Sequence, residues 1–248
     1  MTRKRTCIVV PCYNEAKRLD GNAFLTFLRR EERIDVCFVN DGSDDATLPL
    51  LRRLADTLPD RISVLHLERN RGKAEAVRAG ILHVAGNHDA VGFIDADLAT
   101  PLDEVLRLVE IREQAEAPAV IGSRMRRLGV QIDRTALRHY TGRLFATVVS
   151  ILFHLNAYDT QCGAKVFEAG IAGEIFRAPF LSKWLFDVEL LLRLRGLPDH
   201  PLSRTQEVPL HAWYERSGSK IKPSYLLRIP IELARIWRQY RGTGTLYS

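Results

Sequence analysis

Two carboxylates close together are the clearest sign of chemistry in the sequence. Asp95 and Asp97 end a short apolar stretch, and residues two apart in an extended chain point to the same side. Two neighbouring anions repel each other unless a cation lies between them. Mg²⁺ and Mn²⁺ accept one or two carboxylates together with the phosphate oxygens of a substrate. The pair therefore predicts a divalent-metal site on a phosphorylated substrate, with a turn of capping aspartates as the plainer alternative.

Four more polar clusters stand where apolar stretches end. They are residues 11–15, 41–45, 69–73 and 122–124. Taken singly, each is as consistent with a turn or a helix cap as with a binding site. Together they would meet at one edge of a sheet, and that coincidence indicates a binding site there.

The elements that would position these clusters alternate along the first half of the chain. Apolar stretches are found at 7–12, 36–41, 62–67, 90–95 and 119–122. Helical patterns are found at 20–32, 44–58, 72–85 and 101–114. Continuous apolar strands separated by amphipathic helices predict an α/β fold with one Rossmann-like, mostly parallel sheet flanked by helices. Such sheets bind ligands at the carboxyl ends of their strands.

The second half is less regular and is predicted to be mainly helical. Helices are expected over 134–155, 182–195 and 223–241. We expect one domain, residues 1–222, followed by a C-terminal amphipathic basic helix within residues 223–248.

Composition narrows the function classes. The chain has 248 residues, 46% of them hydrophobic and 27% charged, with a net charge of +6. These values exclude a disordered, collagen-like or disulfide-stapled chain. The four cysteines form no CxxC pair and are expected to be buried, as in a reducing cytoplasm. The longest apolar run, 144–155, is shorter than the roughly 20 residues of a membrane span, and no signal peptide is expected.

As a set, the motifs resemble the inverting glycosyltransferases of family 2, which have the GT-A fold. The resemblance is carried by residues 9–15 (VVPCYNE), 39–43 (VNDGS), 70–73 (NRGK) and 95–97 (DAD). Residues 159–165, 184–190 and 213–220 resemble a narrower branch, the dolichyl-phosphate β-glucosyltransferases and their polyprenyl-phosphate relatives. The resemblance covers about residues 5–222. It implies transfer of a hexose, glucose being favoured, from a nucleotide sugar, UDP-glucose being favoured.

The resemblance also implies roles for residues of the nucleotide half. Pro11, Tyr13 and Glu15 would line the base and the ribose. Asp41 would accept a hydrogen bond from the edge of the base.

Around the diphosphate, the resemblance implies that Lys73 and Arg124 bind phosphate oxygens. Asp95 would face the donor, and Asp97, together with Asp95, would hold Mg²⁺ or Mn²⁺. One departure from the family pattern, Ala99 where the mannosyl branch often has Gln, favours a glucosyl enzyme.

The acceptor decides whether a base is needed. A sugar hydroxyl needs a general base, whereas a polyprenyl monophosphate, with a second pKa of about 6, is largely dianionic near neutrality. Asp159 and Asp187 are the candidate catalytic residues, with Asp159 favoured near the reacting centre and Asp187 open between base and acceptor positioning. The remaining candidates, for the acceptor or its phosphate, are Lys220, Arg126 and Trp184.

Positive charge is concentrated in two segments beside apolar stripes. Residues 122–145 hold six basic residues and one acidic residue, and residues 215–248 hold seven and two. This pattern favours a peripheral protein on an anionic membrane surface, at its cytoplasmic face. A packed amphipathic helix or a dimer contact would give the same pattern. The oligomeric state is not set by the sequence.

Other function classes were weighed against this one. A family 2 transferase acting on a saccharide, as in polysaccharide or lipopolysaccharide assembly, would share the donor site but need a base. A nucleotidyltransferase would carry a Gly-rich phosphate loop where residues 11–15 stand. Binding of nucleic acid is suggested only by a pI near 9.3, without an aromatic stacking platform.

Overall fold

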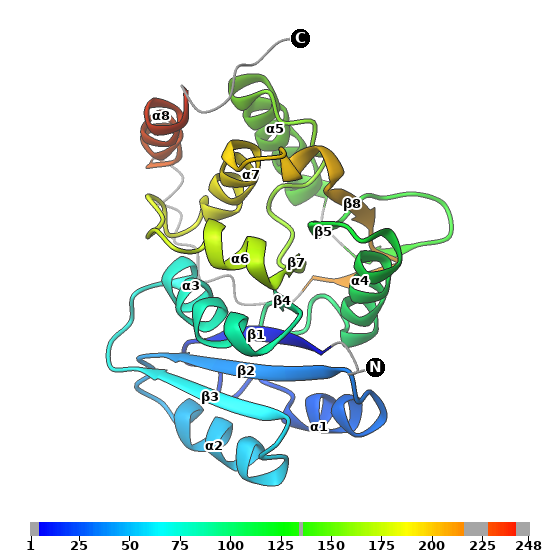
Figure 1. Ribbon diagram of the computed structural model, residues 1–248, viewed down its shortest axis with the longest axis vertical. Helices are drawn as coiled ribbons and strands as arrows, with labels where there is room; N and C mark the ends of the chain where they lie inside the picture. Colours follow the sequence, from blue (N-terminus) through cyan, green and yellow to red (C-terminus); the bar gives the residue numbers. More distant parts are fainter. Residues whose placement is uncertain (1–4, 134–135, 216–227, 242–248) are drawn as a thin grey trace.

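A seven-stranded sheet runs through the centre of the molecule (Figure 1). The computed structural model describes residues 5–133, 136–215 and 228–241. In spatial order the strands are β3 (Ile62–Leu67), β2 (Ile34–Asp41), β1 (Thr6–Cys12), β4 (Ala90–Phe93), β7 (Lys165–Glu168), β5 (Ala119–Ser123) and β8 (Gln206–Pro209). All neighbouring pairs are parallel except the two that β7 makes. The predicted mostly parallel sheet is confirmed.

Strand β7 was not expected from the sequence. It lies antiparallel between β4 and β5, and its first residue, Lys165, is opposite Phe93 on one side and Ile121 on the other. Because β7 runs against its neighbours, it begins at the edge where the parallel strands end. Residues 159–164, which precede it, are thereby brought to the edge that carries Asp95 and Asp97.

Two layers of helices cover the sheet. Helices α1 (Gly21–Arg30), α2 (Thr47–Thr57) and α4 (Leu102–Ala115) contribute to one core, and α3 (Lys73–Val84), α6 (Ala169–Ile175) and α7 (Phe186–Gly196) to the other. Alternate residues of β1 enter opposite cores, for example Val9 and Val10. Burial on both faces explains why the strands are continuous apolar runs. All four cysteines are buried and none forms a disulfide, as expected.

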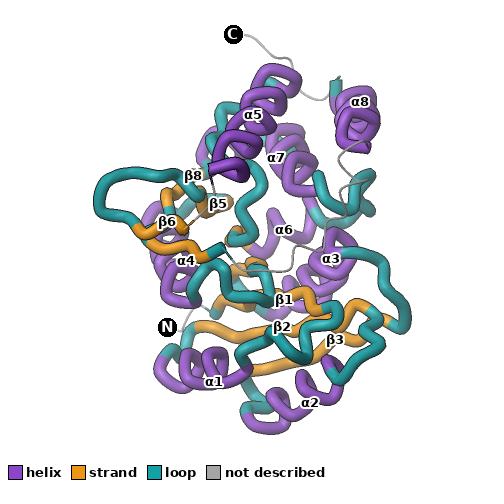
Figure 2. The backbone as a smooth tube through the Cα atoms, turned by 180° about the vertical axis from the view of Figure 1, so that it is seen from behind, coloured by secondary structure: helices purple, strands orange, loops and turns teal. Residues whose placement is uncertain are grey.

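Helices α5 (Ala136–Phe153) and α8 (Ile229–Tyr240) lie with α7 at one end of the molecule, as Figures 1 and 2 show from opposite sides. Beside β5 and β8, β6 (Gln131–Asp133) and β9 (Ala212–Tyr214) form a small parallel pair (Figure 2). Two short 3₁₀ turns span Ala85–Asn87 and Pro201–Arg204. Within the described ranges, no helix combines the length and the apolarity that crossing a membrane requires.

The predicted elements of the first half begin and end within three residues of the observed ones. In the second half, the start of helix α7 differs from the prediction: the helix begins at Phe186, whereas the sequence predicted a start at 182. The carboxylate of Glu189, inside the helix, accepts hydrogen bonds from the backbone N–H groups of Leu181 and Ser182. The Ser182 hydroxyl in turn accepts one from the N–H of Leu185, at 2.7 Å. These bonds hold the preceding segment as a capping loop.

Helix α3 packs closely on the sheet at Gly80. A methyl group there would lie 2.5 Å from Val9 Cγ1 and 2.7 Å from Val39 Cγ2. Gly80→Ala should therefore destabilise the fold by up to about 2 kcal/mol, because overpacking costs about 1–3 kcal/mol and the helix propensity of Ala returns only about 1 kcal/mol. Gly173→Ala in α6, where nothing lies within 4 Å, is the control and should be neutral or stabilising. Urea unfolding of both variants measures the difference, and equal effects would contradict the close packing.

Candidate active site

The clusters singled out from the sequence meet at one edge of the sheet. The loops after β1, β2, β4 and β5 leave the sheet there, and the loop before β7 enters it there. This edge brings together three pairs of opposite charges, which are Lys73 with Asp95, Arg124 with Asp159, and Lys165 with Asp187.

Lys73 and Asp95 form the first pair. Lys73 Nζ lies 2.5 Å from Asp95 Oδ1, so the first residue of α3 is tied to the end of β4. Burial opposes the charge of Lys73, but the carboxylates of Asp95 and Asp187 outweigh it and raise the pKa of this lysine. Lys73 is therefore a permanent cation beside the predicted metal-binding carboxylates.

Asp97 lies two residues further on and is partly exposed. Its Oδ1 accepts a hydrogen bond from the N–H of Ala99 at 3.0 Å, and Arg18 Nη2 approaches its Oδ2 at 3.3 Å. Arg18 also lies 3.7 Å from Glu15, so it connects the loops after β1 and β4. Sequence reasoning missed Arg18, because nothing in its surroundings marks it.

The residues present suit a hard divalent cation only in part. In the part of the chain that the structure describes, no group of three or more His, Cys, Asp or Glu side chains is placed to hold a metal ion. Asp95 and Asp97 supply hard carboxylate oxygens, which Mg²⁺ and Mn²⁺ prefer, and the side chains are 40% and 25% exposed. An ion bound by these two residues would take its other ligands from a substrate or water.

Arg124 and Asp159 form the second pair, in a two-pronged arrangement. Arg124 Nε and Nη2 donate to the two carboxylate oxygens of Asp159 at 2.6 and 2.8 Å, and the Arg124 backbone N–H adds a third bond. Burial opposes ionisation of Asp159, but the charge and hydrogen bonds of Arg124 outweigh it and lower the pKa of Asp159 to about 2. The guanidinium also lies over the Trp213 ring, 5.6 Å from its centroid. Arg124 is thus held rigidly at the end of β5.

This arrangement does not favour Asp159 as a base. A carboxylate with a pKa of about 2 binds a proton weakly near neutral pH, and both of its oxygens already accept hydrogen bonds. The backbone of this loop is itself fixed, because Glu207 on β8 accepts hydrogen bonds from the N–H groups of Tyr158 and Asp159, both at 2.7 Å. Glu207, which sequence reasoning also missed, positions Asp159, and Asp159 positions Arg124.

Lys165 and Asp187 form the third pair, which is buried. Lys165 Nζ lies 2.5 Å from Asp187 Oδ1, donates to the carbonyl of Cys162 at 2.7 Å and lies over the Phe93 ring. The Lys165 side chain has no exposed surface. Burial raises the pKa of Asp187, and the charges of Lys165 and Lys73 offset only part of that rise. Of the two predicted base candidates, Asp187 is therefore the more basic.

Lys165 could have been recognised from the sequence. It interrupts an otherwise apolar stretch, Ala164 to Phe167, and a lysine in a buried strand needs an anionic partner. The adjoining Gly163 answers a second requirement, because a methyl group at this position would lie 2.1 Å from Asp95 Oδ2. A larger residue in the loop before β7 would have to displace the Asp95 carboxylate, which Lys73 holds.

The remaining predicted residues have the following surroundings. The two carboxylate oxygens of Asp41 accept hydrogen bonds from the N–H groups of Arg71 and Gly72, at 2.7 and 2.9 Å. Asp41 therefore holds the loop before α3, and its contact with a base stays a prediction. Glu15 is buried. Pro11 and Tyr13 are half-buried at the end of β1.

The three residues predicted to bind the acceptor or its phosphate take no part in the three ion pairs described above, as far as the structure describes them. Trp184 is half-buried in the loop before α7, and Arg126 is exposed in the loop between β5 and β6. Lys220 lies outside the described residues. Their roles stay predictions.

Comparisons with known proteins agree with this architecture. The model of the family described as "Glycosyl transferase family 2" matches residues 7–176. A dolichyl-phosphate beta-glucosyltransferase of Trichomonas vaginalis is 33% identical over 96% of this chain and 72% of its own. The dolichyl-phosphate beta-glucosyltransferase of Saccharomyces cerevisiae is 31% identical over 86% of this chain and 68% of its own.

Solved structures show the same fold at lower identity. Glucosyl-3-phosphoglycerate synthase from Mycobacterium tuberculosis, in complex with Mn²⁺, UDP and phosphoglyceric acid, superposes with a TM-score of 0.69 at 15% identity, over 98% of this chain and 80% of that one. A mannosyltransferase from Pyrobaculum calidifontis, with GDP-Man and Mn²⁺, gives 0.64 at 18% identity, over 99% and 66%. The predicted GT-A fold is confirmed.

The buried pair yields a prediction about stability. Lys165→Met leaves the Asp187 carboxylate buried without its cation, and we expect a loss of about 3–5 kcal/mol in the free energy of unfolding. Adding Asp187→Leu should restore most of that loss, because an apolar pair tolerates burial. Urea unfolding of the two variants tests this, and a double variant as unstable as the single one would show that charge pairing is not what Lys165 contributes.

The pair of Arg124 and Asp159 yields a prediction about acid stability. A folded-state pKa of about 2 against an ordinary 3.8 stabilises the fold fully above pH 3.8, and this stabilisation is lost as the pH falls through about 2. It amounts to about 2 kcal/mol. The free energy of unfolding of the wild type should fall between pH 5 and pH 2, and in Asp159→Asn this fall should be smaller by about 2 kcal/mol. Asp56→Asn, at an exposed site, should keep the wild-type slope.

Proposed function

Because the chain belongs to glycosyl transferase family 2, we propose that it transfers glucose from UDP-glucose to a dolichyl or other polyprenyl phosphate. A nucleotide-sugar-dependent glycosyltransferase is the shared activity of the family and of its similar relatives. The lipid phosphate and the glucose are taken from the names of those relatives, which match most of this chain.

The three ion pairs support the choice of a lipid phosphate as the acceptor. A saccharide hydroxyl must lose a proton to a base, whereas a phosphate monoester is already an anion near neutrality. Both base candidates are bound to cations, Asp159 to Arg124 and Asp187 to Lys165. A site whose carboxylates are neutralised in this way suits an acceptor that brings its own negative charge. This is the observation on which the choice of acceptor rests.

The donor end of the site is suited to a leaving diphosphate. Breaking the bond to the anomeric carbon leaves negative charge on the nucleoside diphosphate, and attack from the opposite face inverts that carbon. Lys73 stands beside Asp95 and can share this charge, and Asp41 keeps the lysine's loop in place. Asp95 and Asp97 would hold Mg²⁺ or Mn²⁺, which when bound neutralises the diphosphate as a Lewis acid.

The acceptor also bears on where the protein works. A polyprenyl phosphate resides in a membrane, and we propose a peripheral position of the protein on the cytoplasmic face. A family 2 transferase acting on a saccharide is the second candidate, favoured by the raised pKa of Asp187, which would serve as its base.

A donor and acceptor screen tests these proposals. Purified protein with Mg²⁺ or Mn²⁺ is given labelled UDP-glucose or GDP-mannose, with and without polyprenyl monophosphate. We expect label in lipid from UDP-glucose alone, lost in EDTA and reduced at least about 100-fold in Asp97→Asn, because the diphosphate loses its counter-charge. Asp103→Asn, at an exposed carboxylate on α4, is the matched control and should retain activity.

The same screen separates the two acceptors. Asp187→Asn leaves the buried Lys165 without its anion, so its kcat is compared with that of Lys165→Met, which breaks the same pair but keeps the carboxylate. If the phosphate needs no base, Asp187→Asn should keep at least as much kcat in the lipid reaction as Lys165→Met. Turnover that requires a saccharide, ignores lipid and is abolished by Asp187→Asn would favour the second candidate. Transfer from GDP-mannose would overturn the choice of donor.

A further inference from the structure

Helix α5 carries an apolar stripe that is largely exposed to solvent. Tyr140, Leu144, Val148 and Ile151 follow one another at helical spacing on one face. Their exposed fractions are 71%, 68%, 42% and 71%. Six of the nine exposed large hydrophobic residues in the described ranges lie on α5 and α8. Such residues are usually scattered singly over a protein surface, so this concentration indicates a contact surface.

Over residues 140–153, whose side chains the structure describes, the exposed face of α5 also lacks charge. Between residues 140 and 153 the only charged side chain is Arg143. Its guanidinium carbon lies 3.7 Å from the centroid of the Tyr158 ring, and Nη1 donates to the Tyr158 carbonyl at 3.1 Å. This arginine is directed at the loop of the active site. A helix facing water normally carries charged residues outward, which the described side chains of α5, residues 140–153, do not.

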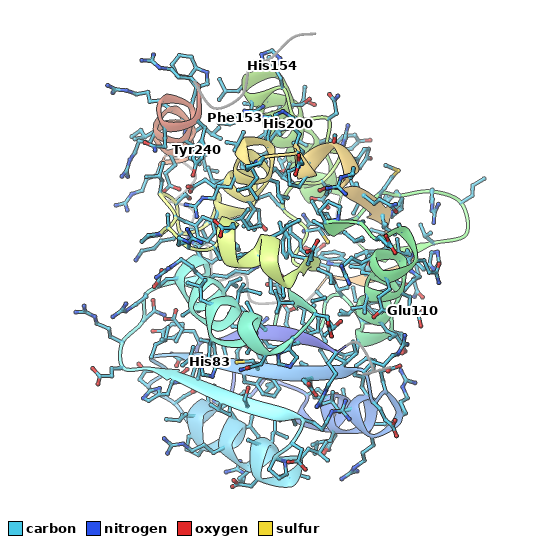
Figure 3. All side chains as sticks on the ribbon, viewed as in Figure 1. His83, Glu110, Phe153, His154, His200 and Tyr240 are labelled. Carbon is cyan, nitrogen blue, oxygen red and sulfur yellow. The ribbon has the colours of Figure 1, made fainter. Side chains whose placement is uncertain are left out.

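Helix α8, at the same end of the molecule, carries exposed positive charge. Figure 3 shows Tyr240 of α8 at the end of the molecule where Phe153 and His154 close α5, far from His83 and Glu110. Four arginines in or beside α8 are exposed, namely Arg228, Arg235, Arg238 and Arg241. The only acidic residue of the helix, Glu232, is half-buried and accepts a hydrogen bond from the Ser182 hydroxyl. Ile231 and Trp237 are exposed among these arginines.

Helix α8 is firmly attached, so the arginines are carried by a rigid element. Leu233 and Ile236 are buried in the core that also contains Val149 and Phe153 of α5. The hydroxyl of Tyr240 accepts a hydrogen bond from Arg193 Nε at 3.0 Å and donates one to Glu189 at 3.3 Å. The apolar face of α5 and the basic face of α8 are therefore both anchored in the same hydrophobic core.

We propose that α5 and α8 form the surface on which the protein docks to an anionic lipid bilayer. In an anionic bilayer, the stripe of α5 can be buried at the boundary of headgroups and acyl chains, and the arginines of α8 can bind the negative headgroups. A second copy of the chain is disfavoured, because this end is basic and the chain carries a net charge of +6. The stripe is about 17 Å long and one-sided, as in a helix that lies in the interface.

The same docking would serve the reaction, and this part rests on the proposed function. Arg143 joins α5 to Tyr158, the residue before Asp159, which holds Arg124. A bilayer against α5 would therefore place a lipid phosphate beside the loop that carries these charges.

Vesicle sedimentation of the 248-residue chain tests the surface without donor, metal or polyprenyl phosphate. We expect binding to phosphatidylcholine vesicles with 30% phosphatidylserine, and at least about tenfold weaker binding for Leu144→Glu with Ile151→Glu. Leu144→Gln with Ile151→Gln, which adds no charge, should also bind more weakly. Leu82→Glu on α3, far from this end, is the control and should bind like the wild type. Arg235→Glu with Arg238→Glu should lose the preference for anionic lipid, each arginine being worth about fivefold.

Three results would overturn the proposal. These are no wild-type binding to anionic vesicles, equal binding by the Leu144 and Ile151 variants, or a wild-type dimer in sedimentation velocity that these variants convert to monomer. The last would assign the face to a second copy.

Activity separates this surface from the proposed function. The Glu variant should lose transfer to dolichyl phosphate in vesicles but keep transfer to a short, water-soluble isoprenyl phosphate. If the protein binds vesicles as expected yet glycosylates neither acceptor, the proposed acceptor is wrong and the docking surface stands.

Discussion

The pairing of charges at one edge of the sheet is the constraint on which the rest of the structure depends. A site for a nucleoside diphosphate needs cations, and the carboxylates that would hold a metal need cations of their own. At this edge Lys73 with Asp95, Arg124 with Asp159 and Lys165 with Asp187 place a cation beside each of three carboxylates. Each pair joins two different elements. Losing one partner would therefore leave a charge with poor solvation and loosen the edge.

The antiparallel strand β7 is what makes this pairing possible. A further parallel strand at this position would place its beginning at the far edge, and the loop before it could not reach Asp95. By reversing direction, the chain brings Gly163 against Asp95 and Lys165 against Asp187. The fold thus adds a polar loop to a sheet edge that already carries the ends of the parallel strands.

Much of this was predictable from the sequence, and the failures have a physical cause. The parallel strands, the helices of the first half and the edge at which Asp41, Asp95 and Arg124 meet follow from local patterns of apolar residues. Strand β7 did not, because it is four residues long and its register depends on β4 and β5. The partners of Asp159 and Asp187 are 35 and 22 residues away in the sequence, so the weakened basicity of Asp159 could not be read locally.

The position of β7 in the chain also affects the order in which the site can be assembled during synthesis. Asp95 has Lys73 as a partner as soon as both have left the ribosome, since Lys73 precedes it in the chain. Gly163, which packs against Asp95, is synthesised 68 residues after it (163 − 95 = 68). A partly synthesised chain can therefore form the parallel strands β1 to β4 while the loop before β7 is still missing from the site. The last of the three pairs to be completed is that of Lys165 with Asp187.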